Sequence, residues 1–198
     1  MILPLAGFAF ITSVTPGPNN ILLLGSGLRF GLLPTVPHIL GIQVGVALQL
    51  ILCAYGLGVL LMEMPLAQLI LKIVGTAYLL YLAWNLRNNS VANEDLKENI
   101  KNARPFTFIQ AVLFQFINPK AWIMTLTAGG LFLPNLDSKF LSILLLCLVF
   151  NSVGTPSSGS WAVIGSLIKR FLQDPFWQKC FSWGMVSITA YTALAIWL

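Results

Sequence analysis

The chain carries long apolar stretches that contain almost no charged side chains. About 20 apolar residues form a helix long enough to cross a hydrocarbon core about 30 Å thick. Only 9% of the 198 residues are charged and 57% are hydrophobic, whereas about a quarter of the residues in a soluble domain are charged. The sequence therefore predicts an integral membrane protein.

Six such stretches can be marked along the chain. Lipid offers no partner for backbone N–H and C=O groups, so uniformly apolar spans of this length are expected to be helices and not the strands of a barrel. We expect an all-α integral membrane protein with a single transmembrane domain, residues 1–198. The predicted spans cover residues 2–27, 37–61, 66–86, 106–133, 140–168 and 176–198.

The basic residues predict the orientation of these spans. One side of the membrane would carry only Lys72 and Lys139, and the other would carry eight basic residues in or near the first, third and fifth connections. The positive-inside rule places those odd connections in the cytoplasm and both termini in the periplasm. The net charge of +5 is then mostly loop charge attracted to lipid, and it indicates no nucleic-acid partner. The eight residues are Arg29, Arg87, Lys97, Lys101, Arg104, Lys169, Arg170 and Lys179.

A polar connector, residues 87–105, divides the chain into halves of about 1–86 and 106–198. Each half has three spans, an odd number, so two repeats would lie in opposite orientations as a 3+3 inverted repeat. The first span of each half is interrupted near mid-depth, by "SVTPGPNNILLLG" from Ser13 and by "QFINPKAWIM" from Gln115. Interruptions at corresponding positions of two halves are typical of a transporter's substrate site.

The local chemistry predicts helices that stop and restart. A Thr or Asn directly before Pro fits the N-cap and first position of a helix, and Thr15-Pro16 and Asn118-Pro119 both have this pattern. Thr155-Pro156 is a third candidate. A restarted helix presents N–H groups and a positive dipole end, which favour a carboxylate. Released carbonyls and the Asn side chains offer acceptors for an ammonium group.

These breaks predict a site for a zwitterionic substrate, and the alternative is a proline kink that only bends the helix. Lys120 is the one basic residue deep in a span. It either attracts the substrate carboxylate, or snorkels or caps the freed carbonyls of the first span. The predicted site residues are Thr15, Pro16, Gly17, Pro18, Asn19, Asn20, Asn118, Pro119 and Lys120.

Other polar and sulfur residues give weaker signals. No carboxylate falls within a predicted span, and His38 is expected at the membrane interface. Gly41 and Gly45 form a G-x-x-x-G pattern that predicts close helix packing. The cysteines lack metal-ligand spacing, so no metal or cofactor is predicted.

The motifs "TPGPNN", "GxxYLLYLAW" (Gly75–Trp84) and "NPKAW", over six spans, resemble the lysine exporter (LysE/RhtB) family of bacterial amino-acid efflux proteins. "ITSVTPGPNNILLL", "LFQFINPKAW" and "FLP" look most like its cysteine/O-acetylserine exporter branch. The resemblance implies an inner-membrane secondary transporter, not an enzyme. It would export a small amino acid or derivative, of the cysteine/O-acetylserine or threonine/homoserine kind, by alternating access. It also implies that residues Pro16 to Asn20 and Asn118 to Lys120 take part in the function.

The wider superfamily includes thiol-electron conduits, whose paired cysteines lie beside prolines in the first span of each half. Here Cys53 and Cys147 fall in the second and fifth spans and do not adjoin the breaks. A membrane thiol-electron conduit using these two cysteines is the alternative function. The sequence leaves open which amino acid is moved, which driving force is used and whether the chain forms a homodimer, which its small-residue faces would permit.

Overall fold

The computed structural model describes the chain except residues 1, 57–62, 89–103, 169–173, 196 and 198. The described part contains eight helices and no strands, so the all-α prediction is confirmed. The helices are α1 (Ile2–Val14), α2 (Pro18–Phe30), α3 (Leu32–Ala54), α5 (Pro65–Asn88), α7 (Phe108–Ile117), α8 (Pro119–Leu131), α9 (Lys139–Ile168) and α10 (Pro175–Ala195).

Two of these helices, α3 and α9, are long and apolar enough to cross a membrane by length and composition. Helices α1 and α7 and residues Pro65–Ala77 of α5 are shorter apolar segments. The described surface exposes many large apolar side chains, and Leu3, Leu33 and Leu131 are 84%, 82% and 76% exposed. Apolar patches of this extent are rare on soluble monomers and suit contact with lipid.

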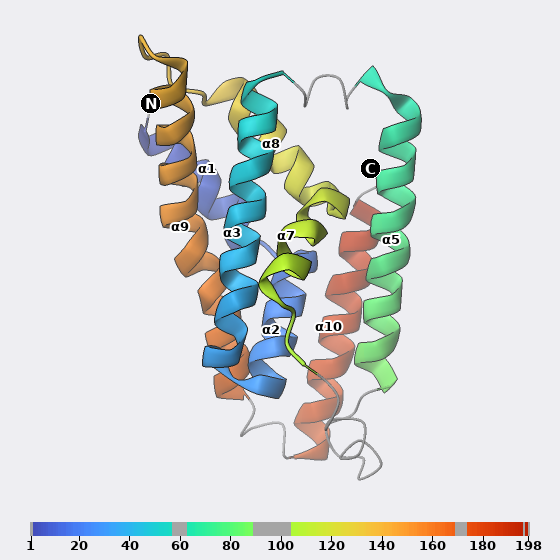
Figure 1. Ribbon diagram of the computed structural model, residues 1–198. Coiled ribbons are helices and arrows are strands. Elements are labelled where there is room, and N and C mark those ends of the chain that lie inside the picture. The colour runs from blue at the N-terminus through green and yellow to red at the C-terminus, as the bar shows by residue number, and fades with distance from the viewer. Residues whose placement is uncertain (1, 57–62, 89–103, 169–173, 196, 198) are drawn as a thin grey trace.

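The helices pack as a group of six with a pair beside it (Figure 1). In the group, α9 packs against α1, α2 and α3, and α3 packs against α7 and α8. The pair is α5 and α10, which pack side by side at one edge (Figure 1). The start of α1 and the end of α10 lie toward the same end of the bundle (Figure 1). The structure therefore brings the early helices α1 and α2 together with the late helix α9.

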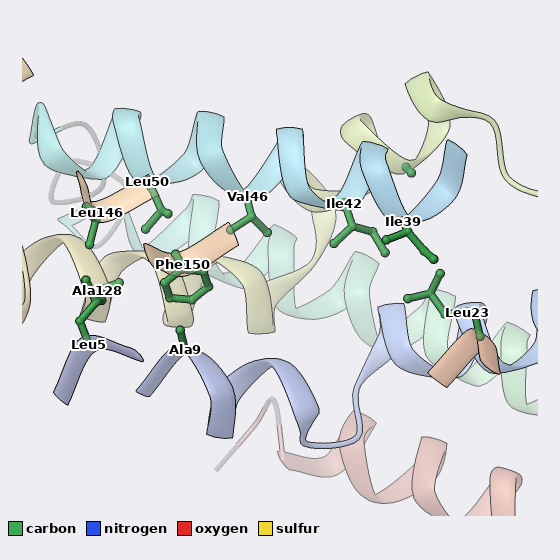
Figure 2. Packing of buried hydrophobic residues seen from close by; sticks show 12 residues of the cluster. Leu5, Ala9, Leu23, Ile39, Ile42, Val46, Leu50, Ala128, Leu146 and Phe150 are labelled. Atoms are coloured by element: carbon green, nitrogen blue, oxygen red, sulfur yellow. The ribbon is translucent and has the colours of Figure 1, made fainter. Parts of the chain in front are cut away.

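The buried apolar core lies between α1, α3, α8 and α9. Figure 2 shows Val46 and Leu50 of α3 beside Phe150 and Leu146 of α9, with α1 below them. Lipid is as apolar as these side chains, so close packing, more than exclusion of water, holds such helices together in a membrane. The core residues drawn on α1 are Leu5 and Ala9, and each is at most 1% exposed.

Glycines allow the closest helix contacts. A Cβ at Gly27 of α2 would collide with the backbone of Ala162 in α9, and one at Gly165 would collide with the backbone of Leu24. Gly41 of α3 likewise faces the Phe108 carbonyl of α7, and a Cβ at Gly45 would collide with Gln115 Cγ. The predicted close packing at Gly41 and Gly45 is therefore confirmed, with α7 as the partner.

Two sequence expectations about these helices are wrong. The second span does not begin at residue 37, because α3 starts at Leu32 and contains Pro37. Thr155-Pro156 does not restart a helix. Helix α9 runs through Pro156, and Thr155 Oγ1 donates to the Asn151 carbonyl of its own helix at 2.7 Å. His38, for which an interfacial position in the membrane is predicted, is 1% exposed, and Phe106, two residues before α7, stacks on it with ring centroids 5.0 Å apart.

Candidate functional site

The first break lies between Val14, where α1 ends, and Pro18, where α2 begins. Gly17 occupies the N-cap position in an extended conformation and offers no side-chain cap, and Pro18 is the first helical residue. The predicted Thr15-Pro16 start is therefore wrong by two residues. Thr15 instead completes the end of α1, since its Oγ1 donates to the Thr12 carbonyl at 3.1 Å. In a continuous helix the residue at position 16 would donate its N–H to this carbonyl, but Pro16 has no N–H.

The carbonyl groups released at this break are already occupied by side chains. Pro18 cannot donate to the Val14 carbonyl, and Trp161 Nε1 of α9 donates to it at 3.2 Å. Asn20 Nδ2 donates to the carbonyls of Ser13 and Thr15, at 2.9 and 2.7 Å. The carbonyl groups released here were the predicted acceptors for a substrate ammonium. In this conformation they instead accept hydrogen bonds from the protein's own side chains, and these bonds stabilise the break.

The second break is shorter and has a side-chain cap. Helix α7 ends at Ile117 and α8 begins at Pro119, and Asn118 Oδ1 accepts from Lys120 N at 3.2 Å. The predicted Asn118-Pro119 cap is thus confirmed. Pro119 cannot donate to the Gln115 carbonyl, which accepts from Asn118 N at 3.1 Å and from Gln49 Nε2 of α3 at 2.9 Å. At each break, one carbonyl that a proline cannot serve therefore receives a side-chain donor from a helix in the other half of the chain.

Lys120 joins the two breaks. Its Nζ donates to the Thr15 carbonyl at 2.7 Å, to Thr15 Oγ1 at 3.0 Å and to the Pro16 carbonyl at 3.2 Å. A Cβ at Gly17 would lie 2.7 Å from Lys120 Cδ, so a larger residue here would displace the lysine side chain from its present path. The sequence leaves more than one role open for Lys120. In this conformation its ammonium group caps carbonyls that are free at the first break.

A pair of amide side chains makes a second link between the breaks. Asn19 Nδ2 of α2 donates to Gln115 Oε1 at 2.8 Å, and Gln115 Nε2 donates back to Asn19 Oδ1 at 3.2 Å. Gln115 and Gln49 are both completely buried. Sequence patterns did not single out these two glutamines or Gln43 of α3. Their signal was a polar amide within an otherwise apolar span, where an unpaired amide is costly.

A cavity opens at the breaks, between α1, α2, α3, α8 and α9, with an empty volume of about 450 Å³ including its mouth. Ile42, Val46 and Phe150, all drawn in Figure 2, form apolar wall, together with Ala121 and Met124. Its polar lining comes from Thr12, Ser13, Gln43 and Ser158 and from six predicted site residues. Those six are Gly17, Pro18, Asn19, Asn20, Asn118 and Lys120.

The remaining predicted residues, Thr15, Pro16 and Pro119, lie next to the cavity without lining it. Thr15 and Pro16 hold Lys120 through their carbonyl groups, and Pro119 begins α8. Among the residues that line the cavity, Lys120 is the only one with a charged side chain. The structure thus brings the two interrupted segments together around one cationic cavity.

The cysteines lie elsewhere. Cys53 Sγ contacts Thr125 Oγ1 at 3.7 Å and Cys147 Sγ contacts the Ala47 carbonyl at 3.9 Å, and neither residue lines the cavity. Both are free thiols, as is Cys180. Within the described ranges, no cluster of His, Cys, Asp and Glu side chains could hold a metal ion.

Comparison with known proteins gives consistent matches over most of the chain. The family described as "LysE type translocator" matches residues 10–190. The cysteine/O-acetylserine efflux protein of Klebsiella pneumoniae is 27% identical over 96% of this chain and 93% of its own length. The protein of the same name from Escherichia coli K12 is 29% identical over 84% of this chain and 83% of its own length. No solved structure matches this chain.

Proposed function

Since this chain belongs to the LysE type translocator family, a family of transporters and not of enzymes, we propose that it exports a small neutral amino acid or derivative across the bacterial inner membrane. The efflux proteins it resembles are named for cysteine and O-acetylserine. Compounds of that kind, with threonine and homoserine, are the candidate substrates. The observation that carries the proposal is the cavity in which the two helix breaks meet around Lys120.

The start of α2 supplies a place for the substrate carboxylate. The first N–H groups of a helix have no partner within the helix, and Gly17 offers them no side-chain acceptor. They carry the positive end of the helix dipole and, with the Lys120 ammonium, favour an anion in the cavity. The carboxylate of an amino acid would bind here beside Asn19 and Asn20, both of which line the cavity.

The charge of the cavity indicates the class of amino acid. A zwitterion adds no net charge to a cavity whose lining contains one cation and no carboxylate. Lysine or arginine would place a second cation near Lys120, and burying an unpaired charge is costly. The proposed substrates are therefore neutral at the side chain.

The packing supports an inverted repeat of residues 1–86 and 106–198, with six spans and with spans 1 and 4 interrupted. Helix α9 of the second half packs on α1 and α2 of the first, and α3 of the first half packs on α7 and α8 of the second. Trp161 of α9 donates to one break and Gln49 of α3 donates to the other. Helices α5 and α10, the third span of each half, pack on each other. These corresponding contacts of the two halves are compatible with an inverted repeat, whose substrate site lies where the halves meet.

In this arrangement both termini are periplasmic and the 87–105 connector, most of which falls outside the described residues, is cytoplasmic. The start of α1 and the end of α10 lie toward the same end of the bundle (Figure 1), which agrees with both termini on one side of the membrane, and the excess of basic residues in the odd connections favours the periplasm for that side. Alternating access would move one half against the other. The Lys120 and Asn19–Gln115 contacts cross between the halves, so we expect them to change during transport. Besides its substrate and lipid, a homodimeric partner is compatible with this arrangement.

Efflux from cells tests the function. We would load cells with labelled cysteine, O-acetylserine, threonine or homoserine and compare export by wild type and Asn19→Ala at equal membrane abundance. Selective efflux that is lost in Asn19→Ala is the expected result. If none of the four compounds leaves faster than from cells without the protein, the proposal is wrong.

A further inference from the structure

A group of neutral oxygen atoms lines the cavity on helices other than the one that carries Lys120. Ser13 belongs to α1, Gln43 to α3 and Ser158 to α9, and all three residues line the cavity. None of them has been assigned a role by the sequence pattern or by the relatives. Because they belong to three different helices, their meeting depends on the tertiary structure.

The amide nitrogen of Gln43 makes a hydrogen bond within the protein, and its amide oxygen receives none from the described residues. Its Nε2 donates to Ser158 Oγ at 3.3 Å, and its Oε1 accepts from no described residue. Gln43 lines the cavity and is 8% exposed, and its Oε1 is not among the fully buried atoms that lack a partner. The oxygen is therefore accessible from the cavity and is suited to a donor on a ligand.

Gly154 of α9 leaves space for this oxygen. A Cβ at Gly154 would lie 3.0 Å from Gln43 Oε1 and 3.6 Å from Ser13 Oγ. The first distance is tighter than ordinary van der Waals contact, so any larger residue would press on the amide. Both oxygens therefore border the same side of α9, and the glycine keeps that side open.

This inference rests on the proposed function: we propose that Gln43 Oε1 and Ser13 Oγ accept hydrogen bonds from the ammonium group of the substrate. An ammonium carries three N–H donors and needs acceptors wherever it leaves water. The cavity lining has no carboxylate to serve it, and the carbonyls released at the first break already have donors from Asn20, Trp161 and Lys120. Gln43 on α3 and Ser13 on α1 line the cavity with side-chain oxygens that receive no donor from the described residues.

The substrate class follows from this assignment. The carboxylate lies at the start of α2 and the ammonium lies at Gln43, so recognition requires a free α-amino group. Carboxylic acids without the amino group would lose the ammonium contact. A hydrogen bond to a charged group is strong enough that its loss weakens binding by about tenfold to a hundredfold.

The test measures selectivity for the amino group. Purified protein in proteoliposomes loaded with cysteine takes up labelled cysteine by counterflow. We compare inhibition of this uptake by unlabelled cysteine and by 3-mercaptopropionate, which lacks only the amino group. Wild type should prefer cysteine by about tenfold or more. Gln43→Met, which keeps the length of the side chain and removes the acceptor, should bring this preference close to one.

Two control variants separate recognition from folding. Gln49→Met changes another buried glutamine of α3 that does not line the cavity, so it should lower the amount of folded protein but keep the preference. Gly154→Ala should lower the preference without changing Gln43, whereas Gly159→Ala, on the same helix with open space at its Cβ, should not.

The outcomes are distinct. An unchanged preference in both Gln43→Met and Gly154→Ala overturns the ammonium assignment while cysteine counterflow by wild type continues. Absence of counterflow in wild type overturns the proposed function itself, and the ammonium assignment with it. If Gln43→Met does not fold, the comparison of Gly154→Ala with Gly159→Ala tests the ammonium assignment. An equal preference for cysteine in these two variants then overturns it.

Discussion

Replacing Lys120 with Met should both loosen the protein and impair export. Methionine keeps an unbranched side chain of similar length, so it preserves most of the packing against Gly17. It removes the ammonium group and with it all three hydrogen bonds that Lys120 Nζ makes across the breaks. The change therefore tests how much these bonds contribute.

The loss of stability depends on which other donors each carbonyl keeps when the Lys120 ammonium is removed. The Thr15 carbonyl keeps Asn20 Nδ2 as a donor, but the Pro16 carbonyl receives no other hydrogen bond from the described residues. An unpaired carbonyl costs about 1–3 kcal/mol when it is buried. Pro16 is exposed in the structure, so water replaces part of the lost bond. We expect a decrease of about 1–2 kcal/mol in the free energy of unfolding.

Thermal unfolding of purified protein in detergent measures this decrease. For a chain of this size the midpoint should fall by about 2–8 °C. Lys179→Met, which removes an exposed lysine on α10, is the matched control and should leave the midpoint unchanged. Export of labelled cysteine by Lys120→Met should fall well below wild type at equal abundance. Wild-type stability together with wild-type export in Lys120→Met would refute the reasoning.

Three further changes test the fold around the cavity. Gln49→Leu removes the side-chain donor to the Gln115 carbonyl, which keeps the Asn118 N–H at 3.1 Å, and should lower the free energy of unfolding by about 0.5–1.5 kcal/mol, measured by chemical denaturation. Gly27→Ala should destabilise by about 1–3 kcal/mol through overpacking against α9, whereas Gly25→Ala, where the Cβ meets open space, should not. Replacing all three cysteines with serine should leave cysteine efflux intact, and its loss would favour the thiol-electron conduit.

Local chemistry explains which parts of the site could be predicted. Asn118-Pro119 could be predicted as a cap because an Asn before a single Pro leaves one position for the helix to start. The first break offered two prolines, Pro16 and Pro18, and the sequence alone does not rank them. The structure starts α2 at Pro18 because Thr15 is held at the end of α1 by its own hydrogen bond and by Lys120.

Contacts between distant segments were beyond local reasoning. Gln49 and Trp161 supply the donors that the prolines cannot, from helices far along the chain, and no spacing rule connects them to the breaks. The burial of His38 could not be predicted either, since Phe106, which stacks on it, is 68 residues away.

Counterflow in proteoliposomes tests the central claim most directly, because it needs only the purified protein and its substrate. Wild type loaded with cysteine should accumulate labelled cysteine, with O-acetylserine competing and lysine not competing. The same protein carrying Asn19→Ala, reconstituted at equal density, should accumulate far less. Equal accumulation in Asn19→Ala, or none in wild type, would contradict the account.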